Sequence, residues 1–236
     1  MIKKTSVRFR WAIALLTVAG ISAAGWSRVS SARGRREPLP FADLSITLEA
    51  NETDGDGEVN IAIDSGDALK YVDVFDPNGR RVGRVRSRDQ GKLGIGKMIL
   101  ETPELSVDEA KAAYPSGTYA FKGRTMDDLP IAGEAELSHD VPTATQFTSP
   151  TDQATGVVRE GLVAAWSAVT GATGYVFELE QSDLGIELKA ILPASSTSIE
   201  IPATLLVPNT SYQIGIGVTV ESGNRSFNEI HFETGG

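Results

Sequence analysis

The 236-residue chain contains no cysteine and only two histidines, His139 and His231. The absence of cysteine excludes disulfides, thiol catalysis, thiolate metal sites and lipidation through an N-terminal cysteine. The sequence also lacks a pair of histidines at metal-binding spacing, a glycine-rich loop that could cradle phosphate, and a nucleophile elbow. We therefore predict that the protein is not an enzyme, and we expect both histidines to be structural.

Two observations qualify that prediction. Ser138-His139-Asp140 has the residue types of a catalytic triad, but adjacent residues of a strand point to opposite faces and cannot form the relay. Carboxylates that converge in space could still support glycoside hydrolysis. An accessory to, or remnant of, a secreted hydrolase therefore stays an alternative.

Positive charge is scarce beyond the N-terminus. The chain carries 22 Lys and Arg against 31 Asp and Glu, a net charge of −9, and residues 1–40 alone contribute +7. An acidic folded part is a poor partner for nucleic acid, because phosphate binding needs a basic face. We interpret the acidity mainly as a contribution to solubility.

The N-terminus has the pattern of a secretory signal. Basic residues precede an apolar run from Trp11 to Ala24, and small residues end it at Ser22-Ala23-Ala24-Gly25. The run is shorter than the roughly 20 residues that cross a bilayer. We predict a bacterial signal peptide at 1–24, a disordered linker at 25–40 and a secreted, periplasmic or cell-surface location. An uncleaved anchor is the alternative, because arginines follow the run. The basic residues are Lys3, Lys4, Arg8 and Arg10 before the run, and Arg28, Arg33, Arg35 and Arg36 after it.

Residues 41–140 have the pattern of an immunoglobulin-like β-sandwich. Short segments in which apolar and polar residues alternate are separated by turn residues, which indicates strands. Ser106-Val107-Asp108-Glu109 has the spacing of a capping box, so we predict one short helix that ends before Pro115. The expected strands are centred on 44–48, 59–63, 72–74, 81–88, 93–100, 119–121 and 131–137.

An acidic loop at 51–58 is the candidate metal site. With Glu52 as the first position of an EF-hand-type loop, Asp54, Asp56 and Gly57 fall at positions that suit Ca²⁺, but Ile63 stands where the bidentate Glu belongs. Asp-Gly-Asp-Gly is also an ordinary hairpin turn. If the loop binds calcium, which is the only cofactor that we consider, Asp54, Asp56 and Glu58 are the expected ligands.

The candidate partner-binding residues are Arg84, Arg86 and Arg88, which share one face of a predicted strand. That face could meet an anionic glycan or an acidic protein. The competing interpretation is an edge strand that its charge protects from unwanted pairing.

Residues 143–236 give the clearest fold signal. A Pro208-Asn209 turn leads into a strand on which Tyr212, Ile214, Ile216 and Val218 share one face. A tyrosine at such an entry can bury its ring and bond its hydroxyl to nearby backbone, the tyrosine corner of Greek-key sandwiches.

Other residues extend the pattern to a known family. Trp166, Gly174-Tyr175, Leu206-x-Pro208-x-Thr210-x-Tyr212 and Phe232-x-Thr234 stand in an order that resembles a fibronectin type III domain over about residues 143–235. The resemblance implies a seven-strand sandwich and nothing catalytic. The sequence has no Arg-Gly-Asp, so integrin-type recognition has no support.

The sequence as a whole predicts an all-β protein with two tandem sandwiches, immunoglobulin-like at 41–140 and fibronectin type III-like at 143–236. The expected function is a non-catalytic binding, adhesion or spacer module with a protein or cell-surface glycan partner. A calcium-binding structural or adhesive module is the alternative. We expect contact with a membrane only through the N-terminal segment.

Overall fold

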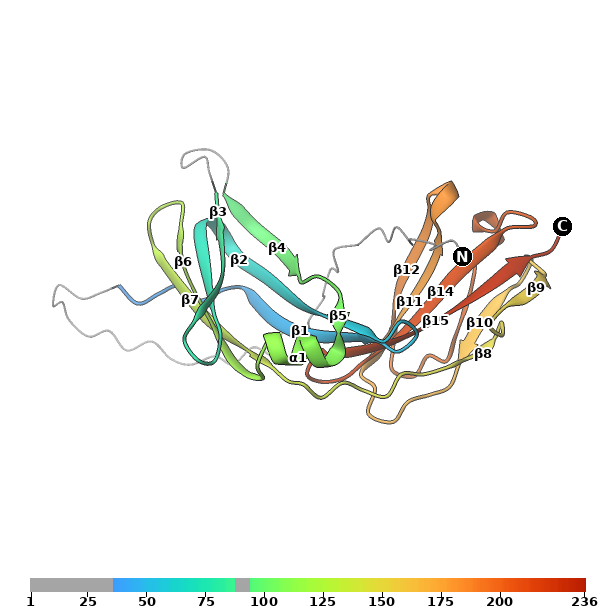
Figure 1. Cartoon of the computed structure of the whole chain (residues 1–236). Helices are drawn as coiled ribbons and strands as arrows, with labels where there is room; N and C mark the ends of the chain where they lie inside the picture. The colour runs from blue at the N-terminus through green and yellow to red at the C-terminus, as the bar shows by residue number, and fades with distance from the viewer. Residues whose placement is uncertain (1–35, 88–93) are drawn as a thin grey trace, which may run out of the picture.

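The computed structural model describes residues 36–87 and 94–236. The predicted signal peptide, most of the predicted linker, and Arg88 lie outside the described residues. Within the described ranges, no helix is long and apolar enough to cross a membrane. The chain forms an elongated molecule with a β-sandwich at each end, and β1 and β15 meet between them (Figure 1).

The first half is built from strands and one short helix. Leu39 already pairs with Ile131, so ordered structure extends into the segment that was expected to be linker. The elements are β1 (Asp43–Asn51), β2 (Asp56–Phe75), β3 (Arg81–Arg86), β4 (Ile95–Glu101), β5 (Leu105–Ser106), α1 (Val107–Ala113), β6 (Gly117–Thr125) and β7 (Pro130–Leu137).

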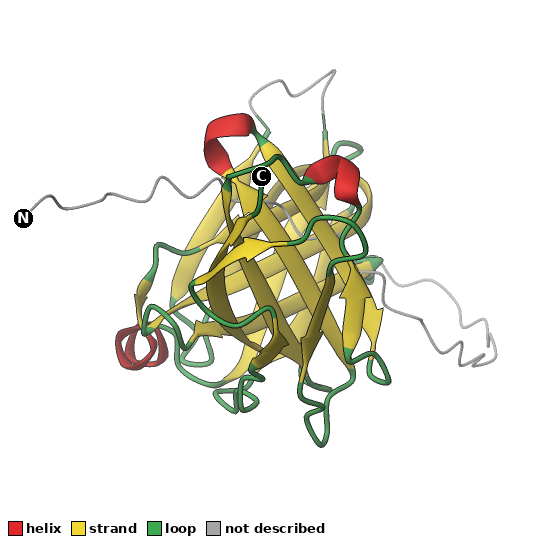
Figure 2. Cartoon of the chain, turned by 90° about the vertical axis from the view of Figure 1, so that its right-hand side faces the viewer, coloured by secondary structure: helices red, strands yellow, loops and turns green. Residues whose placement is uncertain are grey.

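The second half is a sandwich in which the short strands β8, β10 and β13 face the layer β12-β11-β14-β15. Viewed from this end, strands fill the interior and the helical turns lie at the periphery (Figure 2). The elements are β8 (Phe147–Ser149), β9 (Ala154–Val157), β10 (Val163–Trp166), β11 (Gly174–Gln181), η1 (Ser182–Leu184), β12 (Ile186–Pro193), β13 (Ser198–Glu200), η2 (Ala203–Leu205), β14 (Ser211–Thr219) and β15 (Arg225–Thr234).

The prediction of separate strands at 59–63 and 72–74 is wrong. Both belong to β2, a single strand of 20 residues whose register shifts between Asp64 and Tyr71. Gly66, at φ +68°, adopts the left-handed conformation that glycine tolerates, so the strand bends there without reversing. The first part of β2 pairs with β1 and β4, and the second part pairs with β3 and β6.

Each half buries its own hydrophobic core. In the first half, alternate residues of the strands point inward, and Leu69, Tyr119 and Phe121 are completely buried. In the second half, Trp166 packs against Tyr175 and stacks on Phe177. The all-β prediction is therefore confirmed, and the second half is a fibronectin type III-like sandwich at the level of its fold.

Two local predictions are confirmed. Ser106 caps α1: its hydroxyl accepts from the Glu109 backbone N–H at 3.3 Å, and the Glu109 carboxylate accepts from the Ser106 N–H at 3.1 Å. Tyr212 forms the predicted corner, because its hydroxyl donates to the Leu205 carbonyl at 3.0 Å and accepts from the Val207 N–H at 2.7 Å. The helix ends at Ala113, before Pro115 as expected.

The two sandwiches share one sheet. The C-terminal end of β1 pairs in parallel with the start of β15, with Glu49, Ala50 and Asn51 opposite Arg225, Ser226 and Phe227. Hydrogen-bonded strands therefore run from β12 in the second half to β7 in the first. The sequence indicated a short link at 141–145 but gave no sign of this pairing.

Candidate functional site

The acidic loop contacts the second sandwich. The Glu52 N–H donates to the Phe227 carbonyl at 2.9 Å, and the Thr53 hydroxyl accepts from the Glu229 N–H at 2.8 Å. The Asn51 amide donates to the Glu229 carboxylate at 3.1 Å. The loop therefore extends the pairing of β1 with β15 and takes part in the junction between the halves.

The predicted calcium ligands lie in this loop and at the start of the strand that follows it: Asp54, Asp56 and Glu58. Asp54 lies in the exposed turn, while Asp56 and Glu58 are alternate residues at the start of β2 and share one face. Within residues 36–87 and 94–236, no three acidic or histidine side chains come together as a metal ion requires. Calcium binding stays a prediction that the structure does not test.

Asn224 is the central residue of the junction. It is completely buried between β14 and β15. Its side-chain oxygen accepts from the Leu48 N–H at 2.8 Å, and its amide donates to the carbonyls of Ser138 and Asp140 at 2.9 and 2.8 Å. One side chain of the second half therefore satisfies three backbone groups of the first half. Nearby, the Ser226 hydroxyl donates to the Pro142 carbonyl at 2.5 Å.

A partly buried ion pair lies at the same place. Arg225 Nη1 is 3.7 Å from the Glu49 carboxylate, and the Arg225 side chain is 8% exposed. Although 22% of the Glu49 side chain stays exposed, burial raises the pKa of its carboxyl, an effect that the positive charge of Arg225 opposes.

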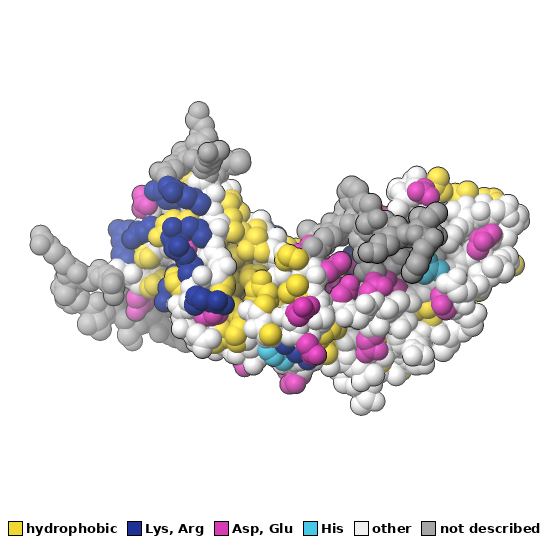
Figure 3. Space-filling model, in the orientation of Figure 1, with side chains coloured by type: hydrophobic (Ala, Val, Ile, Leu, Met, Phe, Trp, Pro, Cys, Tyr) yellow, Lys and Arg dark blue, Asp and Glu magenta, His cyan; other side chains and the backbone are white. Residues whose placement is uncertain are grey.

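Two of the three predicted partner-binding arginines, Arg84 and Arg86, lie on β3. This strand pairs only with β2 among the described residues and is therefore an edge strand. Arg84 and Arg86 are exposed and point to the same side, as the sequence predicts. On the side of the molecule shown in Figure 3, Lys and Arg side chains gather over this end of the first sandwich, and acidic side chains are spread over the second.

The sheet register joins these arginines to residues that sequence reasoning missed. Arg86, Tyr71 and Arg124 stand side by side across β3, β2 and β6. Arg84, Asp73 and Lys122 form the next row, and Phe75 lies opposite Arg81 in the third. Because opposite residues of antiparallel strands point to one side, all eight share a surface. We call it the cationic face: Tyr71, Asp73, Phe75, Arg81, Arg84, Arg86, Lys122 and Arg124.

Asp73 holds Arg84 in place. The Arg84 Nε and Nη2 atoms each donate to an Asp73 carboxylate oxygen at 2.6 Å, and Arg81 lies 3.6 Å from the same carboxylate. The hydrogen bonds with Asp73 raise the pKa of the Arg84 guanidinium above its usual value. The guanidinium also lies over the Tyr71 ring, 5.2 Å from its centre, and Lys122 lies over Phe75 in the same way at 5.3 Å.

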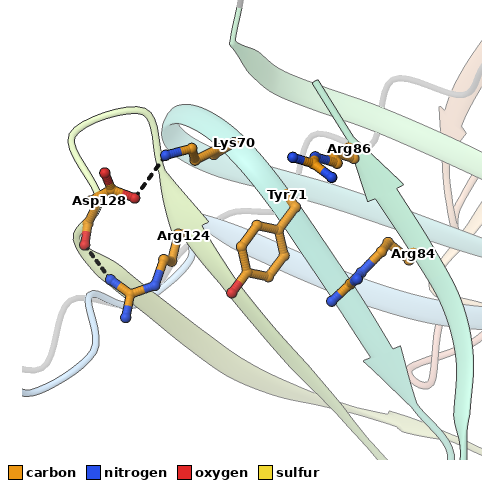
Figure 4. Close-up of a pocket in the computed structure, with 6 residues that line it drawn as sticks. All are labelled: Lys70, Tyr71, Arg84, Arg86, Arg124 and Asp128. Atoms are coloured by element: carbon orange, nitrogen blue, oxygen red, sulfur yellow. Dashed lines mark hydrogen bonds and ion pairs between the residues drawn. The ribbon is translucent and has the colours of Figure 1, made fainter. Parts of the chain in front are cut away.

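A groove of about 310 Å³ opens on this surface (Figure 4). Tyr71 lies between the cations, with its hydroxyl between Arg124 and Arg84 in the view of Figure 4. Lys70 bonds to the Asp128 carboxylate at 2.9 Å, and Arg124 donates to the Asp128 backbone carbonyl at 2.5 Å. The lining residues are Lys70, Tyr71, Arg84, Arg86, Arg124 and Asp128.

The sequence held a weak signal for this groove. Tyr71, Asp73 and Phe75 alternate with buried valines, which indicates a strand with one outward face. Neighbouring strands could not be assigned without the bend in β2, so Arg124 could not be placed beside Tyr71. Arg88, the third arginine of the prediction, lies outside the described residues.

The two histidines lie apart from this surface. The His139 Nε2 atom is 2.7 Å from the Tyr114 carbonyl. The Ser138 hydroxyl accepts a hydrogen bond from the Asp140 backbone N–H at 3.0 Å. Ser138 and His139 therefore bond to different backbone groups and not to each other. The backbone of His231 donates to Asp152 at 3.0 Å, and this hydrogen bond lowers the pKa of the Asp152 carboxyl.

Comparison with known proteins identifies no family for this chain. The chain matches no protein-family model and no curated protein. Among solved structures, the fibronectin(III)-like modules of CbhA from Clostridium thermocellum are 10% identical, with 85% of this chain and 92% of that chain covered and a TM-score of 0.34.

Two chicken proteins are similar to the same degree. The FN1–FN3 domains of CNTN1 are 15% identical, with 84% and 68% of the chains covered and a TM-score of 0.35. A segment of tenascin with two fibronectin type III domains is 13% identical, with 81% and 98% covered and a TM-score of 0.31. At these identities and TM-scores, no property of these proteins is transferred to this chain.

Proposed function

We propose that the protein is an exported, non-catalytic module that holds a binding surface in a fixed position. The observation that carries the proposal is the continuous sheet through β1 and β15, which makes the two sandwiches one unit. A flexible link would let the sandwiches move independently, whereas backbone pairing and the buried Asn224 oppose that motion.

Export is supported by the N-terminal sequence. Basic residues, an apolar run and small residues follow one another at 1–25, as in a signal peptide. Mass spectrometry of the protein recovered from outside the cytoplasm tests this part, because a cleaved protein begins near Gly25 or Trp26. A full-length N-terminus retained in the membrane would support the anchor alternative.

Scanning calorimetry of the intact protein tests the rigid unit. We expect one cooperative transition, because the junction contributes hydrogen bonds that neither half can replace alone. Two separate transitions, each insensitive to changes at the junction, would contradict the proposal.

Calcium binding, the alternative function, is tested by thermal unfolding with calcium and with chelator. A ligand at about 100 times its dissociation constant adds roughly 2.7 kcal/mol to stability. In a domain of this size, such a gain raises Tm by on the order of 10 °C. Calcium binding by Asp54, Asp56 and Glu58 therefore predicts a rise of this size that chelator reverses and Asp54→Asn with Asp56→Asn abolishes.

A further inference from the structure

The cationic face stands out electrostatically. Together with Lys70, it sets six Lys and Arg residues against Asp73 and Asp128, on a chain whose net charge is −9. A local concentration of one sign attracts oppositely charged partners, and the surrounding negative charge repels them from other places. This arrangement favours an anionic partner that contacts the first sandwich at one surface.

The cations of the face differ in what they can still bind. Arg84 is fixed by Asp73 through Nε and Nη2, so its Nη1 donors remain for a ligand. Arg124 donates to the Asp128 backbone carbonyl, and because a carbonyl is neutral, this hydrogen bond does not cancel the positive charge of Arg124. Arg86 pairs with Tyr71 through the sheet, but within residues 36–87 and 94–236 its guanidinium makes no side-chain hydrogen bond or ion pair, and none is drawn in Figure 4. Arg86 and Arg124, on either side of Tyr71, are therefore the principal groups for an incoming anion.

The spacing of the face suits a repeating anion. Alternate residues of one strand are about 7 Å apart, and residues two strands apart are separated by about 9.5 Å. Arg84 and Arg86 have the first spacing, and Arg86 and Arg124 have the second. Arg guanidinium groups bind carboxylate and sulfate oxygens through paired N–H donors, so a polymer with regularly spaced oxyanions can contact several cations together.

Other anionic partners fit less well. Insertion into an anionic membrane uses exposed apolar side chains beside the cations. The most exposed large apolar residues of the described chain all lie on the second sandwich: Val158, Val163, Leu184, Ile191 and Val207. The apolar rings of the cationic face, Tyr71 and Phe75, are only half-buried, but Arg84 and Lys122 lie over them. An acidic peptide remains an outcome of the test.

We propose that the cationic face binds an anionic polysaccharide, with one sulfate or carboxylate group held in the groove by Arg124 and the Tyr71 hydroxyl and a neighbouring group of the polymer held by Arg86. The site extends the proposed binding role by giving its surface and ligand class. It does not depend on the junction between the sandwiches, so a failure here leaves the calorimetric test of the rigid unit unaffected.

Titration calorimetry at low salt tests the proposal, with dextran sulfate and polygalacturonate as the probes and uncharged dextran as the control. The protein is the chain from residue 25 onward. Because Arg28, Arg33, Arg35 and Arg36 are also basic, all measurements use a background in which these four are replaced by Gln. The test variant is Arg86→Gln with Arg124→Gln. The matched control, Lys111→Gln with Arg159→Gln, removes the same charge from other places.

We expect binding of at least one charged polymer, weakened by added salt, and no binding of uncharged dextran. The test variant should bind about tenfold more weakly or worse, because it loses two charge-assisted contacts. The matched control should bind within about twofold of its parent, because Lys111 and Arg159 lie outside the cationic face and charges far from the ligand are largely screened. Equal Tm values for parent and variants would show that the fold is intact.

Several results would overturn the proposal. The first is that neither charged polymer binds at all, and the second is that the test variant binds with unchanged affinity. The third is that the test variant and the matched control lose the same amount of affinity. Each of these three results contradicts the proposal. Tighter binding to polyglutamate or to phosphatidylglycerol vesicles than to either polysaccharide would also overturn it, and would assign the face to an acidic protein or a lipid surface instead.

Discussion

The two sandwiches share one anchoring contact and differ in their surfaces. Tyr119 in the first and Tyr212 in the second each stand at the start of a strand, are buried, and donate a hydroxyl hydrogen to upstream backbone, at Pro115 and Leu205. The first sandwich then presents the cationic face on an edge of its sheet, whereas the second contains only three Lys and Arg residues, Arg159, Lys189 and Arg225.

This difference shows which features set fold and which set role. The tyrosine contacts and inward-facing strand residues stabilise both halves in a similar way and carry no information about a partner. The outward residues of β2, β3 and β6 contribute little to the core. Their charge distinguishes the first sandwich from the second and makes it the half in which a partner is to be sought.

Breaking the junction should have the largest effect. Asn224→Ala leaves the Leu48 N–H and the carbonyls of Ser138 and Asp140 without their partner. Each unsatisfied buried group costs about 1–3 kcal/mol, so we expect a loss of about 3 kcal/mol or more in the free energy of unfolding. Calorimetry should also show the single transition separate into two.

Asn228→Ala is the matched control for that experiment. Asn228 lies on β15, shortly after Asn224 in the sequence, but it is half-buried, and substitutions near the surface change stability by about 0.5 kcal/mol or less. A loss as large as that of Asn224→Ala would mean that β15 itself, and not the contacts of Asn224, explains the effect.

The paired tyrosines allow a sharper comparison. Tyr212→Phe removes two hydrogen bonds, to Leu205 and from Val207, whereas Tyr119→Phe removes one, to Pro115. With about 1 kcal/mol for each bond, we expect losses of about 2 and 1 kcal/mol in chemical denaturation. Equal losses would show that the second bond to Tyr212 contributes nothing.

The smallest effect should be a pH dependence of the junction. Burial raises the pKa of Glu49 above its usual value of 4.5, so the folded state holds this proton more tightly than the unfolded state. The resulting stabilisation is complete below about pH 4.5 and is lost as the pH rises through the raised pKa. The groups that face Glu49 are Arg225, Glu178, Lys189 and Glu101.

Glu49→Gln isolates this contribution. Tm measured from pH 4.5 to pH 8 should show the wild type losing stability relative to the variant as the pH rises. If the difference moves in the opposite direction, attraction to Arg225 outweighs burial, and the pKa of Glu49 is lowered instead.

The sequence predicts the local features well and the long-range ones poorly. The capping box at Ser106 and the tyrosine corner at Tyr212 depend on contacts between residues close in the chain, so their spacing was informative. The pairing of Ala50 with Ser226 joins residues at opposite ends of the folded part, and no period or turn residue marks it. In the sequence, Asn224 has the pattern of an ordinary turn residue, and its role is evident only from its hydrogen bond with Leu48 in the structure.

The candidate site divides in the same way. Arg84 and Arg86 share a face because they alternate on one strand, which the sequence shows directly. Tyr71 and Arg124 join them only through the register of β2 with β3 and β6. The register of β2 shifts between Asp64 and Tyr71, next to the bend at Gly66, and the sequence does not show this shift. The role of 51–58 in the junction likewise depends on Glu229 and Phe227, which lie far away in sequence.

The most direct test of the rigid unit is the distribution of distances between the two sandwiches. Because the chain has no cysteine, Asn78→Cys and Ser195→Cys, both at exposed positions, provide one spin label on each half for pulsed electron paramagnetic resonance. A continuous sheet predicts one narrow distribution that broadens when Asn224→Ala is added. A broad distribution in the protein with intact Asn224 would contradict the account, because it would show that the sandwiches move independently.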